Sequence, residues 1–405
     1  MTRALGRARP AGNPVAVLTS TIPITIDTFH RELIRQVQGQ GYDVCVVSSP
    51  GVELDALREE MGVRVRPLPM TRQVSPLADF MALIAWLRVC LSERPALMVS
   101  ATPKASLLSL LAGKATRTRR RLYYVGGLRL EGDQGAKRQL LWSMERLTSW
   151  ASTEVVANSA SLAAAYAEQR LAPEHKLRQT RPGSGHGVDS SHFTPQVRDL
   201  NLAAELGLDP SIPVIGLIGR LTHDKGVDTL TDAMGLLNDD DISCQLLVVG
   251  NQQEPDSAHY LEVLAAMGSH VVVVGQVGDV RPYFALMDIH VLPSLREGFP
   301  NVVLEASAMG LPTVATDATG AVDSVKDGET GLIVKATDPA GLADAIKNLL
   351  LNPTRAAQYG ASARAWVVNE FQPESVVATL LAFSITVGDT SPSSSKERSD
   401  VAERR

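Results

Sequence analysis

The chain alternates short apolar runs rich in β-branched residues with longer segments whose apolar residues recur at helical spacing. In the first half, the runs PVAVLTS and LMVS precede helix-like segments at 26–40 and 104–115. Strands followed by helices in this way form parallel sheets, and their apolar runs are continuous because both faces of the sheet are buried. The pattern therefore predicts an α/β protein.

The alternation restarts after a polar, irregular stretch around 190–212. There the runs PVIGLIGR, SCQLLVVG, HVVVVGQ and DIHVLPS are each followed by a helix-like segment or a turn. The chain has 405 residues, whereas single hydrophobic cores stop growing at about 250 to 300 residues. We therefore expect two doubly wound, Rossmann-like domains. Ligands bind beyond the carboxyl ends of parallel strands, so the domains should face each other across a ligand-binding cleft.

Composition and charge narrow the function classes. Hydrophobic residues make up 44% of the chain, and the formal net charge is -5. The chain thus lacks the overall positive charge that would indicate a nucleic-acid-binding protein. The cysteines Cys45, Cys90 and Cys244 lie far apart in apolar stretches without a CxxC pair. They predict buried thiols, with no disulfide and no zinc site.

Neither end of the chain predicts a targeting or membrane-spanning segment. The N-terminal stretch lacks the apolar core of a signal peptide, and the longest apolar stretch, MALIAWLRVC, is too short for a bilayer and contains Arg88. We therefore expect a cytoplasmic protein. Residues 1–13 are basic and contain Pro and Gly, and residues 388–405 are polar, so both ends are expected to be disordered.

A basic run, KATRTRRR, follows the amphipathic stretch SLLSLLAG. Its cations are Lys114, Arg117, Arg119, Arg120 and Arg121. One interpretation is a solvated helix end and loop. The other is a patch that rests on anionic lipid headgroups, where each basic residue contributes ~1 kcal/mol. Such a patch would bring the protein to a membrane-held substrate.

Two glutamates flank a Gly-Phe-Pro-Asn turn in the stretch SLREGFPNVVLEASAMG. Glu297 precedes a predicted helix with Asn301 as the expected N-cap, and Glu305 lies about one turn inside it, ~6 Å further along the axis. Both carboxylates can line one side of a strand-end cleft. The free N–H groups of the turn there suit phosphate oxygens or sugar hydroxyls. Taken alone, the glutamates also fit a supporting role at the helix N-terminus.

A second motif, GRLTHDKG at 219–226, follows the strand-like run PVIGLIGR and opens a helix-like segment. It places Arg220 and Lys225 at a strand's carboxyl end. A guanidinium and an ammonium, with backbone donors, can neutralise a diphosphate leaving group without a metal ion. The acidic stretch NDDDIS at 238–243 lies between helix and strand and is interpreted as a turn.

Together with GSGHGVDSSHF at 183–193, these stretches resemble the family 4 glycosyltransferases of the GT-B fold. The spacing from Glu297 to Glu305 is that family's signature, and the resemblance extends over about residues 14–387. It implies an α/β fold of two Rossmann-like domains. It also implies that a sugar is transferred with retention from a nucleotide-sugar, for which a UDP-sugar is the first expectation.

The resemblance also implies a division of the chain. The expected parts are an acceptor-binding domain at 14–198, a nucleotide-sugar-binding domain at 199–372 and a helix at 373–387 that returns to the N-terminal domain. The disordered ends at 1–13 and 388–405 complete the chain.

Each motif residue acquires an expected role from the resemblance. Arg220 and Lys225 would hold the donor diphosphate, and Glu305 would hold the ribose hydroxyls. Glu297 would hold the transferred sugar and joins the two cations as a catalytic residue. The other expected donor-binding residues are Gly219, Gly275, Val277, Gly298, Phe299 and Asn301. Among these, the loop around Gly275 to Val277 would grip the nucleobase.

The N-terminal half departs from the family in its first loop. TSTIPITIDTFHREL stands where the family carries a glycine-rich loop, so its phosphate role is open. SATPKASLLSLLAG and VGGLRLEGDQG are similar to a bacterial subgroup that builds capsular, O-antigen or lipid-linked oligosaccharides on polyprenyl-diphosphate acceptors. The candidate acceptor contacts are Lys104, Arg129 and His186. Gly126 and Gly127 stand where many relatives carry a histidine.

The resemblance therefore implies a metal-independent, retaining glycosyltransferase of cell-surface polysaccharide synthesis, without a resident cofactor. Its expected partners are a nucleotide-sugar, a polyprenyl-diphosphate-linked acceptor and the inner face of the plasma membrane. Two other functions stay open, namely glycosylation of a small molecule and epimerisation or hydrolysis of a nucleotide-sugar. A binding protein with an inactive site is a third, although the charged motif residues are all present.

Overall fold

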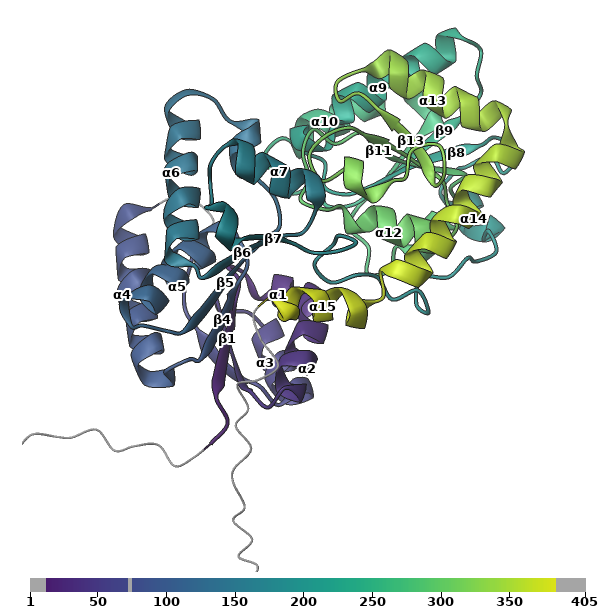
Figure 1. Ribbon diagram of the computed structural model, residues 1–405. Coiled ribbons are helices and arrows are strands. Elements are labelled where there is room, and N and C mark those ends of the chain that lie inside the picture. The colour runs from purple at the N-terminus through teal and green to yellow at the C-terminus, as the bar shows by residue number, and fades with distance from the viewer. Residues whose placement is uncertain (1–11, 72–74, 384–405) are drawn as a thin grey trace, which may run out of the picture.

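The computed structural model describes residues 12–71 and 75–383, which form two α/β domains that lie side by side (Figure 1). Each domain is built on one parallel sheet, with seven strands in the N-terminal domain and six in the C-terminal domain. The predicted fold of two doubly wound, Rossmann-like domains is confirmed. The ends expected to be disordered lie outside the described residues, apart from Gly12 and Asn13.

The N-terminal sheet reverses its strand order between β1 and β4. Across the sheet the strands are β3 (Arg64–Pro67), β2 (Asp43–Ser48), β1 (Val15–Thr19), β4 (Leu97–Ser100), β5 (Arg120–Val125), β6 (Glu154–Ala157) and β7 (Leu177–Gln179). Every described pair of neighbours in this sheet is parallel. The loops after β1 and β4 therefore diverge at the carboxyl edge and open a crevice there.

Helices cover both faces of the N-terminal sheet. They are α1 (Pro23–Phe29), α2 (Arg31–Gly39), α3 (Glu53–Met61), α4 (Pro76–Glu93), α5 (Pro103–Ala115), the 3₁₀ helix η1 (Arg129–Gly132), α6 (Gly135–Ala151), α7 (Ala160–Glu168) and η2 (Glu174–Lys176). The first three pack on one face, where Ile34 and Val46 share a core. α4, α5 and α6 pack side by side on the other face, where Trp86 contacts the buried Cys45 and Cys90.

The C-terminal sheet repeats this plan, with its reversal between β8 and β11. Across the sheet the strands are β10 (Val271–Val274), β9 (Gln245–Val249), β8 (Val214–Ile218), β11 (Ile289–Leu292), β12 (Thr313–Thr316) and β13 (Gly331–Val334). Continuous burial of β8, β9, β11 and β12 agrees with the apolar runs from which the strands were predicted.

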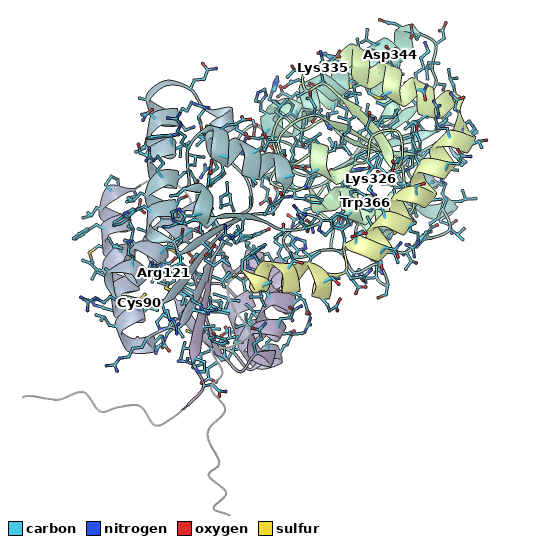
Figure 2. All side chains as sticks on the ribbon, viewed as in Figure 1. Cys90, Arg121, Lys326, Lys335, Asp344 and Trp366 are labelled. Carbon is cyan, nitrogen blue, oxygen red and sulfur yellow. The ribbon has the colours of Figure 1, made fainter. Side chains whose placement is uncertain are left out.

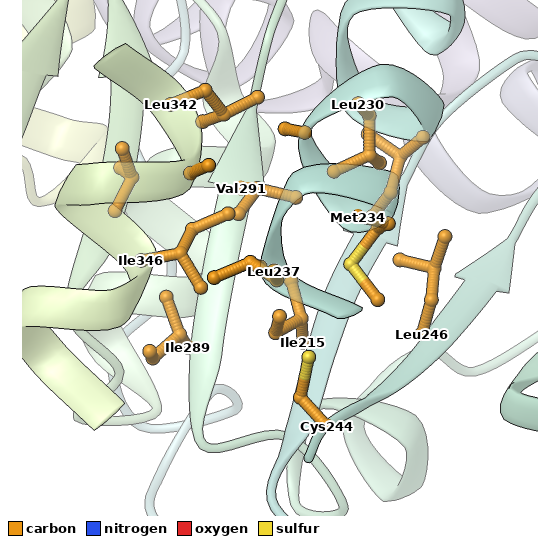
Figure 3. Close-up of a cluster of buried hydrophobic side chains, with 14 of the residues drawn as sticks. Ile215, Leu230, Met234, Leu237, Cys244, Leu246, Ile289, Val291, Leu342 and Ile346 are labelled. Atoms are coloured by element: carbon orange, nitrogen blue, oxygen red, sulfur yellow. The ribbon is translucent and has the colours of Figure 1, made fainter. Parts of the chain in front are cut away.

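The C-terminal domain has helices on both faces as well. They are α8 (Leu200–Glu205), η3 (His223–Lys225), α9 (Val227–Asp239), α10 (Ser257–Ala266), η4 (Gly268–His270), α11 (Arg281–Phe284), α12 (Asn301–Ala308), η5 (Val322–Ser324), α13 (Pro339–Leu351) and α14 (Pro353–Glu370). The last helix, α15 (Pro373–Ala382), packs on the N-terminal domain instead. On one face, Met234 of α9 and Ile346 of α13 pack against Ile215 and Leu246 of the sheet (Figure 3). Cys244 is buried in the same cluster.

The end of the described chain ties the two domains together. α14 packs on α12 and α13, and α15 crosses to the N-terminal domain and packs on α2 (Figure 1). Val377 and Leu381 of α15 lie in the N-terminal core. At the crossing, the Val188 N–H donates to the Phe371 carbonyl at 2.9 Å. None of the described helices is both long and apolar enough to cross a membrane.

Candidate active site

A cavity of about 590 Å³ lies between the two domains, where the carboxyl ends of both sheets face each other. Its walls follow β4 and β5 in the N-terminal domain and β8 and β11 in the C-terminal domain. The strand orders reverse at these places, which is where open parallel sheets bind ligands. The predicted site residues that line it are Gly219, Arg220, Lys225, Glu297, Phe299, Asn301, Glu305, Arg129 and His186.

Lys225 and Glu297 form an ion pair in the cavity wall. The Lys225 ammonium donates to Glu297 Oε1 at 2.5 Å, and Ser294 Oγ donates to the same oxygen at 2.7 Å. Gly226 follows Lys225 and has φ at +68°. No other residue fits there, because an added Cβ would lie 1.9 Å from the Pro293 carbonyl oxygen. The glycine of the DKG motif is therefore required by backbone geometry. It turns η3 so that Lys225 faces β11.

Arg220 stands at the cavity rim directly after β8. Its guanidinium lies 3.2 Å from a Glu254 oxygen and 3.8 Å from an Asp224 oxygen, and its side chain is 47% exposed. The two carboxylates orient the guanidinium without burying it. A guanidinium has five N–H donors in a fixed fork, so it keeps donors for a phosphate while one contacts a carboxylate.

Glu305 projects from α12 into the cavity. Burial raises the pKa of this carboxyl to about 7. The Glu305 carboxylate forms no hydrogen bond or ion pair with another residue in the described ranges 12–71 and 75–383. A carboxyl that is buried without a partner binds strongly to a ligand hydroxyl, since the hydroxyl supplies the missing donor.

The expected N-cap role of Asn301 is wrong. Pro300 is the N-cap of α12, and no side chain caps the helix. The Asn301 amide instead turns to the neighbouring loop, where it donates to the Gly187 carbonyl at 2.8 Å and accepts from Ser184 Oγ at 3.0 Å. The loop from the GSGHGVD stretch therefore competes for this side chain and fixes its position. In the first turn of α12 the Val303 N–H donates to the Pro300 carbonyl, and the N–H groups of Asn301 and Val302 are left for a ligand.

Glycines bring the two domains into direct contact at the cavity. A Cβ on Gly298 of the C-terminal domain would lie 2.0 Å from the Gly126 carbonyl oxygen of the N-terminal domain, and a Cβ on Gly127 would lie 3.6 Å from the Gly298 backbone nitrogen. Gly126 and Gly127 thus admit the loop that carries Glu297 to the N-terminal wall. The missing histidine at these positions is explained in this chain by backbone contact between the domains.

Two neutral histidines form part of the N-terminal wall. Burial lowers the pKa of His30 and of His186 to about 4, and the pair's proximity adds to the effect on His30. His186 stacks on Phe29 with 4.7 Å between ring centroids, and His30 meets Tyr124 edge to face. Neutral imidazoles exchange hydrogen bonds with sugar hydroxyls. His30 was missed because a single histidine in an apolar context carries no motif.

Four of the predicted residues do not line this cavity. Gly275 and Val277 follow β10 at the sheet edge and line neither this cavity nor the adjoining one. Lys104 lines the adjoining cavity, and its ammonium donates to Asp79 at 2.7 Å. Gly298 lies in the loop between the lining residues Glu297 and Phe299. The nucleobase and acceptor roles of these residues stay predictions.

The basic run lies at the opposite edge of the N-terminal sheet. Arg120 and Arg121 begin β5, whose other end leads into the cavity. Figure 2 labels Arg121 on the side of the N-terminal domain that is remote from the C-terminal domain. The half-buried Arg121 donates to the Ala151 carbonyl at 2.7 Å, and the Lys114 ammonium lies 4.1 Å from the Trp150 ring centroid. Part of the run is therefore used within the protein.

Comparisons with known proteins match both halves of the chain to glycosyltransferase families. Residues 212–352 match the family model described as "Glycosyl transferases group 1", and residues 25–183 match the "Glycosyl transferase 4-like domain". The chain is 31% identical over 345 residues to the capsular polysaccharide biosynthesis glycosyltransferase CapM of Staphylococcus aureus. That alignment covers 85% of this chain and 90% of CapM.

Two further similarities extend the comparison. The lipopolysaccharide core biosynthesis mannosyltransferase LpsB of Rhizobium meliloti is 30% identical over 208 residues, which cover 49% of this chain and 58% of LpsB. Among solved structures, Anabaena HepE in complex with UDP and glucose superposes with a TM-score of 0.72 at 18% identity. That superposition covers 90% of this chain and 97% of HepE, and it shows a shared fold.

Proposed function

The chain belongs to the group 1 glycosyltransferases, and on this premise we propose that it transfers a sugar from a UDP-sugar, with retention, to a lipid-linked saccharide. The transfer serves the synthesis of a cell-surface polysaccharide. The names of CapM and LpsB support the product class, and the UDP complex of HepE supports the nucleotide.

The observation that carries the proposal is the meeting of four charged residues in one cavity. Arg220, Lys225, Glu297 and Glu305 come from two separate motifs, yet all four line the same space. Arg220 and Lys225 hold the donor diphosphate, and the unpartnered carboxyl of Glu305 accepts hydrogen bonds from the ribose hydroxyls. The transferred sugar lies against Glu297 and the N–H groups of Gly298, Phe299 and Asn301.

In the proposed reaction, the bond between the anomeric carbon and a diphosphate oxygen breaks as the acceptor oxygen forms a bond to the same carbon. Arg220 and Lys225 stabilise the negative charge that develops on the leaving diphosphate. The acceptor hydroxyl gives its proton to the departing phosphate oxygen. Lys225 exchanges its contact with Glu297 for the phosphate, which frees Glu297 to bind a sugar hydroxyl.

The proposed reaction needs no divalent ion, because two side-chain cations take over the neutralisation of the diphosphate. No group of three or more His, Cys, Asp or Glu side chains is placed to hold a metal within the described part of the chain. Transfer assays with EDTA and with added Mg²⁺ test this directly. Turnover that EDTA abolishes and Mg²⁺ restores would contradict the proposal.

The proposed acceptor is a sugar on a polyprenyl diphosphate at the inner face of the plasma membrane. The basic run from Lys114 to Arg121 is the proposed contact with anionic lipid headgroups. Flotation with phosphatidylglycerol vesicles, compared between the native run and one with Arg117 and Arg119 replaced by Gln, tests this contact. Equal flotation of the two proteins would remove the run from the proposal.

The function as a whole is tested by a donor and acceptor screen. UDP- and GDP-sugars are ranked by thermal shift, and the stabilising donors are incubated with lipid extracts and with no acceptor. The proposal expects a stabilising UDP-sugar and a glycosylated lipid product. An epimerised or hydrolysed sugar from donor alone, with no lipid product, would instead establish the alternative nucleotide-sugar reaction.

A further inference from the structure

We propose that a second, charged cavity binds the phosphate group of a lipid-linked acceptor. It adjoins the cavity of about 590 Å³ in the candidate active site, which is called the sugar cavity from here on. In this proposal Arg129 and Arg296 hold the phosphate, and the first turns of α4 contact the lipid chain. The inference rests on the proposed function, since it names the place where the acceptor of that reaction binds.

The charged cavity has a volume of about 480 Å³ and takes its walls from both domains. It shares Thr25, Thr102, Pro103, Arg129, Arg220 and Arg296 with the sugar cavity, so the two spaces adjoin. Its charged lining residues are the cations Lys104, Arg129, Arg220 and Arg296 and the carboxylates Asp224 and Glu254. Cations outnumber carboxylates, which suits an anionic ligand.

The excess positive charge is concentrated on two of these cations. Arg220 is paired with Glu254 at 3.2 Å and lies 3.8 Å from Asp224, whereas Arg296 has Asp224, at 3.2 Å, as its one ion-pair partner in the described ranges. The exposed Arg129 forms no hydrogen bond or ion pair with another residue of the described ranges. Lys104, in contrast, is paired with Asp79. Arg129 therefore has all its donors available, and Arg296 has more donors than one shared carboxylate can accept.

The positions of Arg129 and Arg296 suit an acceptor better than the donor. Arg129 belongs to the N-terminal domain and Arg296 to the C-terminal domain, and both line both cavities. A phosphate between them would lie beside the sugar cavity, so a sugar attached to it reaches the reacting centre. Arg220 and Lys225 already account for the donor diphosphate. A guanidinium group can donate two parallel hydrogen bonds to two oxygens of one phosphate, which orients the ligand as well as attracting it.

Exposed apolar side chains lie in the first turns of α4, the helix that contacts the wall of the charged cavity. Asp79 lies in the first turn of α4 and ties this helix to Lys104 in the cavity wall. Leu77, Phe80 and Met81 lie in the same turns and are 76%, 59% and 58% exposed. Large apolar side chains gathered on a surface mark a place for an apolar partner. A phosphate site followed by an apolar surface fits an amphiphile, here a phosphate attached to a lipid chain.

The far end of α4 offers a matched control. Leu91 is 64% exposed on the same helix, but it lies ~18 Å from Asp79 along the helix axis at 1.5 Å per residue. If exposure of apolar residues on α4 were sufficient for binding, Leu91 would matter as much as Phe80. If the lipid chain leaves the charged cavity directly, only the residues near Asp79 matter.

Farnesyl diphosphate is a soluble probe that joins an apolar chain to a diphosphate. Its binding to the full chain saturated with UDP is measured by calorimetry, alongside pyrophosphate and farnesol. We expect Arg129→Gln and Arg296→Gln each to weaken farnesyl diphosphate binding at least tenfold. We expect Leu77→Ser combined with Phe80→Ser to weaken it at least tenfold while pyrophosphate binding stays unchanged. Leu91→Ser should leave both unchanged.

The outcomes separate this inference from the proposed function. UDP is titrated first, and failure of UDP to bind would refute the proposed donor. Binding of UDP with unchanged farnesyl diphosphate affinity in both arginine variants would overturn the anion site alone. Equal affinity for pyrophosphate and farnesyl diphosphate would overturn the lipid assignment. Arg129→Gln removes no side-chain hydrogen bond or ion pair within the described chain, so we expect the variant to keep its fold, which thermal unfolding beside the wild type checks.

Discussion

The two walls of the cleft are encoded differently in the sequence. The C-terminal wall takes its charged residues from two short motifs, each of which directly follows a strand at the sheet's reversal point. The N-terminal wall takes its residues from loops after several strands, together with the distant His186. The proposed donor site is thus concentrated in contiguous sequence, whereas the proposed acceptor site is assembled by the fold.

The walls also differ in electrostatics. The C-terminal wall pairs Lys225 with Glu297 at 2.5 Å, where the two side chains are 17% and 13% exposed. The N-terminal wall presents two neutral histidines and the exposed Arg129. Low exposure strengthens the electrostatic contribution of a charge to catalysis. The largest kinetic effects should therefore come from the C-terminal wall.

Replacing Lys225 by Ala should have the largest effect. The variant loses a cation that stabilises the leaving diphosphate, so kcat should fall by about 10² to 10³, or ~2.7–4 kcal/mol. Lys347→Ala is the matched control, because Lys347 also forms an ion pair, with Asp240 at 2.6 Å, on the surface. Steady-state kinetics with saturating donor measure both variants. Equal turnover in the two would show that the C-terminal wall has no special role.

The sequence predicted the C-terminal wall well because its residues follow buried strands that stand out as continuous apolar runs. Arg220, Lys225, Glu297 and Glu305 all line the predicted cleft. Arg296 was missed although it adjoins Glu297, because its position in the cavity wall depends on an ion pair with Asp224 from another loop. The orientation of Asn301 was also missed, because the Gly187 carbonyl that binds it lies 114 residues away. Long-range contacts of this kind leave no local pattern in a sequence.

Gly298→Ala tests the direct contact between the walls. The added Cβ would lie 2.0 Å from the Gly126 carbonyl oxygen, so the loop that carries Glu297 must move away from the N-terminal wall. Displacing a reacting group by about 1 Å lowers turnover on the order of 10²-fold. Gly235→Ala is the control, because Gly235 lies on α9, does not line the cavity, and its Cβ would meet no atom within 4 Å. Unchanged kcat in Gly298→Ala would show that close approach of the walls is unnecessary.

Glu305→Gln tests the buried carboxyl of the C-terminal wall. The pKa of Glu305 is raised to about 7, so the folded protein binds its proton more tightly than the unfolded chain does. Stability from this group is present at low pH and is lost as the pH rises from about 4.5 to 7. Glutamine resembles the protonated acid, so the variant should gain on the order of 2 kcal/mol relative to wild type between pH 5 and pH 8.

Denaturant unfolding at pH 5 and pH 8 measures this difference. A stability difference that is independent of pH would mean that Glu305 has an ordinary pKa. UDP binding supplies the second measurement, because hydroxyl donors favour the ionised carboxylate. We expect wild type to release a proton on binding UDP at pH 6.5, detected as a dependence of the calorimetric heat on the buffer. The variant should bind UDP more weakly and release no such proton.

Ser161→Ala should have the smallest effect, because it weakens one contact that holds the walls together. Ser161 Oγ, at the start of α7, donates to Asp323 of the C-terminal domain at 2.5 Å and accepts from the Gly320 N–H at 2.7 Å. The variant keeps the Ser161 backbone bond to Asp323 at 3.0 Å. Loss of such hydrogen bonds typically costs about 1 kcal/mol, which corresponds to a roughly fivefold change in an equilibrium between open and closed domains.

The result expected for Ser161→Ala is a rise of roughly fivefold in KM for the donor with nearly unchanged kcat, since the closed state is reached less often but has the same chemistry. Ser143→Ala is the control, because Ser143 Oγ donates only to the Gln139 carbonyl within α6. A fall in kcat without a change in KM would instead place Ser161 among the groups that position the reacting atoms. The N-terminal wall would then contribute to the chemical step, and the contrast between the two walls would be smaller than their sequences suggest.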